Sequence, residues 1–97
     1  MNCFAYIREK IPQTELLAQL AEEATELAHA ALKLRRAYDG TNPTPVSRGE
    51  ALENLKEEVA DVELVLALLD LDQYDAECNR IKCEKLERWA RRLEGRE

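Results

Sequence analysis

Apolar residues recur at steps of three and four along most of the chain, a period typical of amphipathic α-helices. A first short segment is expected to end near Pro12, with Phe4, Ile7 and Ile11 as its apolar positions. A second, long segment runs from Thr14, a residue type favoured at helix N-caps, to about Tyr38. Its apolar stripe consists of Leu16, Leu20, Ala24, Leu27, Ala31 and Leu34. This part of the chain therefore predicts two helices.

A third helix is expected after a turn. Asp39-Gly40 supplies a left-handed stop, and 41–46 carries two prolines, so this stretch is predicted to be an ordered turn. Ser47 and Glu50 match the capping box, in which both side chains satisfy free backbone donors at a helix start. The main apolar stripe of this helix is Leu52, Leu55, Val59, Val62, Leu66 and Leu69, and the opposite face carries Leu64, Leu68 and Leu71. A helix that is apolar on both sides is expected to be buried on both sides, in a bundle core or a subunit interface.

A polar break over 70–75 separates a fourth helix, which is expected from about Tyr74 to Leu93 and is ended by Gly95. Its apolar side carries Cys78, Leu86, Trp89 and Leu93. No strand-like alternation or internal repeat competes with this interpretation. The sequence thus predicts an all-α fold, an antiparallel helical bundle of three to four helices, in a single domain that covers residues 1–97.

Length and charge restrict the possible partners. A chain of 97 residues makes one small domain that buries only about 60–70% of its unfolded surface, so an oligomer is expected. The net charge of −6 and the pI of about 4.9 oppose binding to the phosphate backbone of nucleic acids. A small phosphate ligand stays compatible with this charge, because a divalent cation held by carboxylates reverses the sign of the local field.

The cysteines and the apolar runs indicate an intracellular protein. Cys3, Cys78 and Cys83 are odd in number and lack CxxC spacing, which favours free or buried thiols in a reducing compartment. No apolar run suits a signal peptide or a membrane span, so no membrane association is expected. The cytoplasm is the expected location.

Two short words hold paired carboxylates, EEATE on the second helix and EEVAD on the third. Glu23 and Glu26 are three residues apart, so they lie about 60° from each other and border the apolar stripe. Glu58 and Asp61 have the same relation on the third helix. Antiparallel packing of the two stripes would bring these four acids together.

Four carboxylates beside a hydrophobic core would repel each other and lose hydration unless a cation lies between them. Oxygen ligands suit a hard ion, so Mg²⁺ is expected, with Mn²⁺ as a substitute. Glu22 and Glu57 belong to the same words but are expected to point outward. The alternative is that either pair consists of ordinary helix-surface acids, which occur often in a chain with 20 acidic residues.

Taken together, EExxE followed by ExxD resembles the signature of the MazG-like all-α nucleoside triphosphate pyrophosphohydrolase superfamily, over roughly Leu16 to Leu69. The resemblance implies that the four acids are metal ligands and catalytic residues. It implies hydrolysis of a nucleoside triphosphate to the monophosphate and pyrophosphate, in a homodimer or homotetramer. The turn between the two words is longer than is usual in the family, and Glu63 replaces an aliphatic residue. Glu63 is expected to be either an acid that supports the metal ligands or a salt-bridged structural glutamate.

Three basic residues lie around the apolar face of the fourth helix, near Trp89: Lys82, Lys85 and Arg92. Family members carry basic residues on the corresponding helix, so the resemblance implies that these side chains bind substrate phosphates in the same or a neighbouring subunit. The alternative is that they lie along apolar surface or pair with acids on another helix. Phe4, Tyr6 and Trp89 are expected either to stack on a base or to pack in a core or interface.

His29 completes an ExxH word with Glu26, as in di-iron bundles, but that architecture needs a second such word and the chain has no other histidine. His29 is therefore expected to be exposed. The alternative function is a non-catalytic helical oligomer or adaptor that retains a vestigial metal site.

Overall fold

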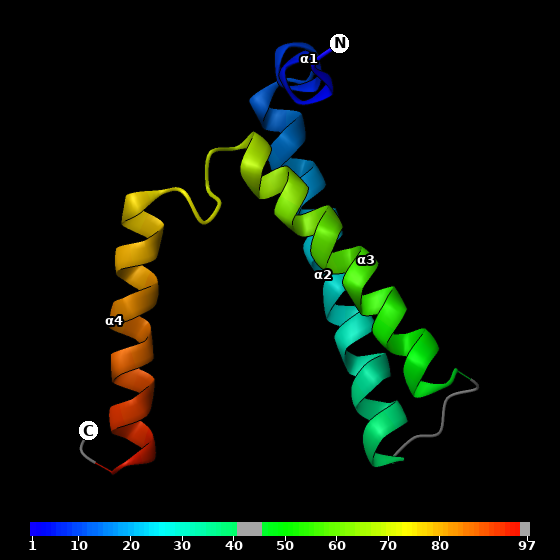
Figure 1. Ribbon diagram of the computed structural model, residues 1–97, viewed down its shortest axis with the longest axis vertical. Helices are drawn as coiled ribbons and strands as arrows, with labels where there is room; N and C mark the ends of the chain where they lie inside the picture. The colour runs from blue at the N-terminus through cyan, green and yellow to red at the C-terminus, as the bar shows by residue number, and fades with distance from the viewer. Residues whose placement is uncertain (41–45, 96–97) are drawn as a thin grey trace.

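The computed structural model describes residues 1–40 and 46–95, which form four helices and no strand (Figure 1). The helices are α1 (Cys3–Lys10), α2 (Gln13–Asp39), α3 (Arg48–Leu68) and α4 (Ala76–Leu93). The all-α prediction is confirmed for these residues. The expected turn over 41–46 lies, apart from Val46, outside the described residues. None of the described helices is long and apolar enough to cross a membrane.

Two of the expected helix ends are confirmed. Gly40 ends α2 in the left-handed conformation, with φ 68°, and its N–H donates to the carbonyl of Arg36 at 2.9 Å. The side chain of Ser47 begins α3, because its hydroxyl oxygen accepts the N–H of Glu50 at 3.2 Å. Local sequence chemistry is sufficient to set these ends, since each involves residues at most four positions apart.

The starts of α2 and α4 correct the sequence prediction. Thr14 is not an N-cap: α2 begins one residue earlier, at Gln13, and Pro12 is the capping residue with φ −62° and ψ 150°. Proline is well suited to this place because its fixed φ fits a helix start and it needs no hydrogen-bond acceptor. Helix α4 begins two residues later than expected, where the Asp75 carboxylate accepts the N–H of Cys78 at 2.8 Å.

Helices α2 and α3 pack side by side in opposite directions, and they are the only two described helices that pack along their length (Figure 1). We call their contact the α2–α3 seam. Its buried side chains are Leu16, Ala30 and Leu34 from α2 and Ala51, Val65 and Leu68 from α3. Ala30 and Ala51 are the most completely buried of these residues, at 3% and 1% exposed.

Most positions of the predicted stripes are buried or half-buried, and a few are not. Those that are covered are Leu16, Leu20, Leu27 and Leu34 of the first stripe and Leu55, Val62, Leu66 and Leu69 of the second. Ala24 and Ala31 were expected in the core but are exposed, and Val59 is 37% exposed. Glu23 and Glu58 instead occupy the half-buried positions between the leucines. The apolar residues of each helix therefore cover two neighbouring sides. One side is buried in the seam, and the other is exposed on the helix pair.

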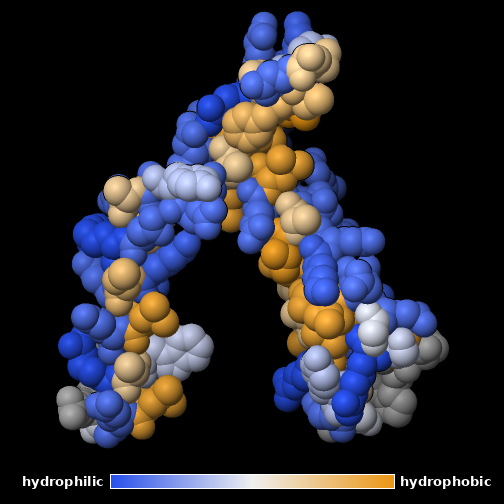
Figure 2. Space-filling view, viewed as in Figure 1, coloured by the Kyte–Doolittle hydropathy of each residue, from blue (hydrophilic) through white to orange (hydrophobic). Residues whose placement is uncertain are grey.

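Outside the seam, much apolar surface is open. The ion pair between Arg8 and Asp70 joins α1 to the residues that follow α3. Helix α4 stands apart from the α2–α3 pair, and its apolar side chains face the open space between them (Figures 1 and 2). Trp89 is 63% exposed and Leu93 80%. The radius of gyration of 17.1 Å exceeds the roughly 12.5 Å of a compact domain of this length. The expected bundle packing is thus present in one chain only between α2 and α3.

Candidate metal centre

Three of the four predicted carboxylates meet on one side of the α2–α3 seam. One oxygen from each of Glu23, Glu58 and Asp61 lies within 4.8 Å of the other two. Glu23 comes from α2, and the three-residue step from Glu58 to Asp61 turns both side chains of α3 toward the same turn of α2. Glu23 and Glu58 are half-buried, whereas Asp61 is exposed. We call these three residues the carboxylate cluster.

Glu26, the fourth predicted ligand, is exposed and lies beside the carboxylate cluster, outside its 4.8 Å limit. It lines the same hollow as Glu58, and its negative charge acts on the Glu58 carboxyl. Within one chain, the structure therefore brings three of the predicted ligands together and places the fourth next to them.

The carboxylate cluster carries an electrostatic cost. Partial burial raises the pKa of Glu58 above its usual value, and the nearby carboxylates of Asp61, Glu26 and Glu23 raise it further. Glu23 is held in place by Gln19, whose amide donates to its Oε1 at 2.7 Å. Like charges this close would be stabilised by a bound cation.

The donor set fits a hard divalent cation. All three ligands are carboxylate oxygens, without nitrogen or sulfur. In an octahedral shell with ligands about 2.1 Å from Mg²⁺, neighbouring oxygens lie about 3 Å apart and opposite ones about 4.2 Å, so the three carboxylates, now within 4.8 Å of one another, would have to draw closer to bind one ion directly. The exposure of Asp61 leaves room for water and substrate oxygens, which Mg²⁺ normally retains in its shell.

The other acids and the histidine lie as follows. Glu22 and Glu57 are exposed, as predicted. Glu63 is also exposed and lines a different hollow with Lys82, so it does not join the carboxylate cluster. His29 is exposed, as predicted, and lines the hollow that contains Glu26. The cysteines are free thiols.

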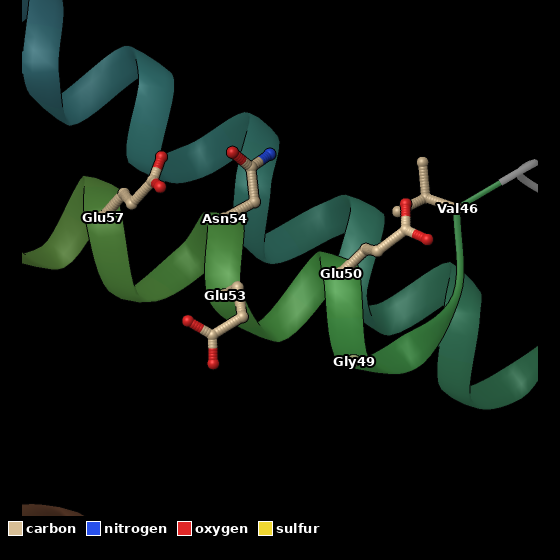
Figure 3. Close-up of a pocket in the computed structure, with 6 residues that line it drawn as sticks. All are labelled: Val46, Gly49, Glu50, Glu53, Asn54 and Glu57. Atoms are coloured by element: carbon tan, nitrogen blue, oxygen red, sulfur yellow. The ribbon is translucent and has the colours of Figure 1, made fainter.

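A hollow at the start of α3 shows why acidic residues alone do not make a site. It is lined by Val46, Gly49, Glu50, Glu53, Asn54 and Glu57. Figure 3 shows that its three glutamate side chains point in different directions along α3. They do not converge on one point, in contrast to the carboxylates of Glu23, Glu58 and Asp61.

The basic residues expected to bind phosphates belong to α4, which stands apart from the α2–α3 pair (Figure 1). They are Lys82, Lys85 and Arg92, and all are exposed. Trp89 on the same helix is exposed as well, while Phe4 and Tyr6 on α1 lie under Arg8 and Lys10 as cation–π partners. Stacking of these rings on a base stays a prediction.

Sequence reasoning missed Lys33, Arg36 and Asn54. These residues line a hollow of about 270 Å³ together with Glu26 and Glu58. The sequence did contain a clue for Lys33 and Arg36. They follow Glu26 by seven and ten residues, so helical spacing places them on the same face of α2 as that carboxylate. Only the pairing of α2 with α3 shows that this face of α2 borders the carboxylates.

The fold and the site thus define an all-α protein with an oxygen-rich candidate cation site between two antiparallel helices. No protein-family model, curated protein or solved structure matches the chain. The functional inference therefore depends on the residues of the site themselves.

Proposed function

We propose that this protein is a Mg²⁺-dependent nucleotide pyrophosphohydrolase, which cleaves a ribo- or deoxyribonucleoside triphosphate to the monophosphate and pyrophosphate. The observation that carries the proposal is the convergence of Glu23, Glu58 and Asp61 from two helices beside an open groove. The resemblance of the EExxE and ExxD words to the MazG-like superfamily supports the same activity. Mn²⁺ is expected to replace Mg²⁺.

The reaction requires one water molecule. The water oxygen forms a bond to the α-phosphorus, the bond from that phosphorus to the bridging oxygen breaks, and pyrophosphate leaves with the electron pair. A carboxylate beside the cluster accepts the proton lost by the water. When bound, Mg²⁺ supplies charge neutralisation at the phosphate oxygens and lowers the pKa of water. Glu23, Glu58 and Asp61 would hold the ion, and the hydrogen bond from Gln19 restrains the Glu23 carboxylate.

We also propose that the protein works as a homo-oligomer, a dimer or a pair of dimers. Its accessible surface of 7620 Å² exceeds by about 1,900 Å² the value expected for a compact monomer of 11.1 kDa. A stable interface needs about 800 Å² from each partner. The open side of the helix pair, with Leu17, Leu52 and Val59, and the apolar side of α4 supply this surface. A second copy that covers them can carry Lys82, Lys85 and Arg92 to the neighbouring cluster.

A nucleotide panel tests the activity. Purified protein is incubated with ribo- and deoxyribonucleoside triphosphates, with and without Mg²⁺, and released pyrophosphate is measured. We expect Mg²⁺-dependent release with at least one nucleotide, and its loss in Glu58→Ala and Asp61→Ala at unchanged helical content by circular dichroism. Glu57→Ala is the matched control, because it removes an exposed acid next to Glu58 and should retain activity.

Failure across the whole panel, with folded protein and with Mg²⁺ present, would leave the non-catalytic oligomer or adaptor as the better account. Light scattering coupled to gel filtration tests the oligomer separately. A monomer at micromolar concentration would contradict the proposed association.

A further inference from the structure

Two hollows of opposite character flank the carboxylate cluster. The first hollow measures about 270 Å³, and we call it the basic hollow. Glu26 and Glu58 lie at the end nearer the carboxylate cluster, and Lys33, Arg36 and Asn54 are among its other lining residues. The second, here the apolar hollow, measures about 330 Å³ and lies on the other side of the cluster. Its lining includes Glu23 and Asp61, with Ile7, Ile11, Leu64 and Leu68 as apolar residues.

Both hollows lie on the same face of the helix pair. Residues three or four apart on a helix share a face, and the lining of the two hollows follows such steps on each helix. On α2 the steps run through Gln19, Glu23, Glu26, Ala30 and Lys33. On α3, in the opposite direction, they run through Leu68, Leu64, Asp61, Glu58 and Asn54. The basic hollow, the carboxylate cluster and the apolar hollow therefore form one continuous groove.

The cations of the basic hollow are available to a ligand. Within the described ranges, neither Lys33 nor Arg36 forms an ion pair, whereas Arg35 in the same turn pairs with Asp39 at 3.4 Å. Lys33 lies about 10 Å along the helix from Glu26, and helical side chains lean toward the N-terminus, which directs Lys33 toward the cluster. These two cations border an acidic site in a chain whose net charge is −6.

We propose that a nucleoside triphosphate lies lengthwise in this groove, with its terminal phosphates at Lys33 and Arg36 and its base over the apolar hollow beside Leu64. This orientation places the α-phosphorus at the carboxylate cluster, between the two ends, and it rests on the proposed pyrophosphohydrolase activity. The anionic end of the substrate meets Lys33 and Arg36, the only lysine and arginine of the described groove lining. The planar base meets its leucine and isoleucine side chains.

Two ligands report separately on binding at the two ends of the groove. Inorganic tripolyphosphate has no base, and α,β-methylene nucleoside triphosphates have both parts but are not cleaved. Binding of each is measured by calorimetry in the presence of Mn²⁺, after Mn²⁺ binding alone has been measured. The variants are Lys33→Gln and Arg36→Gln for the basic hollow and Leu64→Ala for the apolar hollow. Arg35→Gln and Leu71→Ala are matched controls, because Arg35 is paired elsewhere and the 44% exposed Leu71 lines another hollow.

We expect Lys33→Gln and Arg36→Gln to weaken tripolyphosphate and nucleotide binding about tenfold each, because each removes one charged hydrogen bond. Leu64→Ala should weaken only the nucleotide, by about threefold to tenfold. Both controls should bind both ligands as the parent protein does.

Equal loss in Arg35→Gln and Arg36→Gln would overturn the proposed orientation, as would undiminished tripolyphosphate binding in the basic-hollow variants or failure of the parent protein to bind tripolyphosphate. In those cases Mn²⁺ binding and pyrophosphate release would persist, and the proposed function would stand. Absence of Mn²⁺ binding in the parent protein would instead remove the proposed function, and the orientation with it.

Discussion

Replacing Glu58 by Gln removes one negative charge and one ionised ligand from the carboxylate cluster while it keeps the size of the side chain. Glu58 is half-buried in the α2–α3 seam, and one of its oxygens lies within 4.8 Å of oxygens from Glu23 and Asp61. A cation at the cluster would therefore lose one of three charged donors. We expect Glu58→Gln to weaken Mn²⁺ binding about 10- to 100-fold, with helical content unchanged.

Glu57→Gln is the matched control. It lowers the magnitude of the net charge of −6 by the same single unit, but Glu57 is exposed and lies outside the cluster. Its carboxylate is the weakest of the four charges that raise the pKa of Glu58, and it is screened by solvent, so we expect less than about a twofold change in affinity. The difference between these two adjacent positions thus measures the geometry of the site and not the overall charge.

Calorimetric titration of Mn²⁺ into metal-free protein at fixed ionic strength provides the two affinities. A loss in Glu57→Gln as large as that in Glu58→Gln would refute the reasoning, because binding would then follow the acidic surface as a whole. Binding that survives in Glu58→Gln, Glu23→Gln and Asp61→Asn alike would refute it as well.

Three further predictions concern pH, packing and association. The raised pKa of Glu58 means that the folded state holds this proton more tightly, so the unfolding free energy of metal-free protein should fall as the pH rises above 4.5 through the folded pKa. Thermal denaturation from pH 4 to 8 should show this slope, and Glu58→Gln should flatten it; an unchanged slope contradicts the assignment. Leu34→Ala, at a position 9% exposed, should cost about 2–4 kcal/mol in urea denaturation, against less than about 1 kcal/mol for the exposed Leu71→Ala. Trp89→Ala should shift gel filtration with light scattering toward monomer, and an unaltered mass would exclude α4 from the interface.

The helices themselves were predictable because their signals are local. The apolar period, the capping serine at position 47 and Gly40 each act within one or two turns, so the sequence contains all the physics that sets α3 and the end of α2. The error at Thr14 has the same origin, since Pro12 and Thr14 both suit a helix start and only the path of the chain from α1 selects between them.

The candidate ligands were predictable for a related reason. The pairs Glu23 and Glu26 on α2 and Glu58 and Asp61 on α3 recur at helical spacing, and hydrophobic stripes of antiparallel helices must face each other. The sequence could not state which three carboxylates converge, because Glu23 and Glu26 lie only about 60° apart beside the stripe, and the packing of α2 against α3 decides which of them is covered.

The tertiary structure alone determined the direction of the groove. Lys33 and Arg36 resemble ordinary solvent-facing cations until the pairing of α2 with α3 places them in one hollow with Glu58. Likewise, Ala24 and Ala31 fit a core stripe by sequence, but in the structure Glu23 and Ala30 take the covered positions beside them and leave both alanines exposed.

The amphipathic pattern specifies which residues avoid water. It does not specify which of two apolar faces is buried between α2 and α3, because burial of either face would remove apolar surface from water. Only the packing of α2 against α3 shows which face forms the seam and which, with Leu17, Leu52 and Val59, stays exposed and open to a partner.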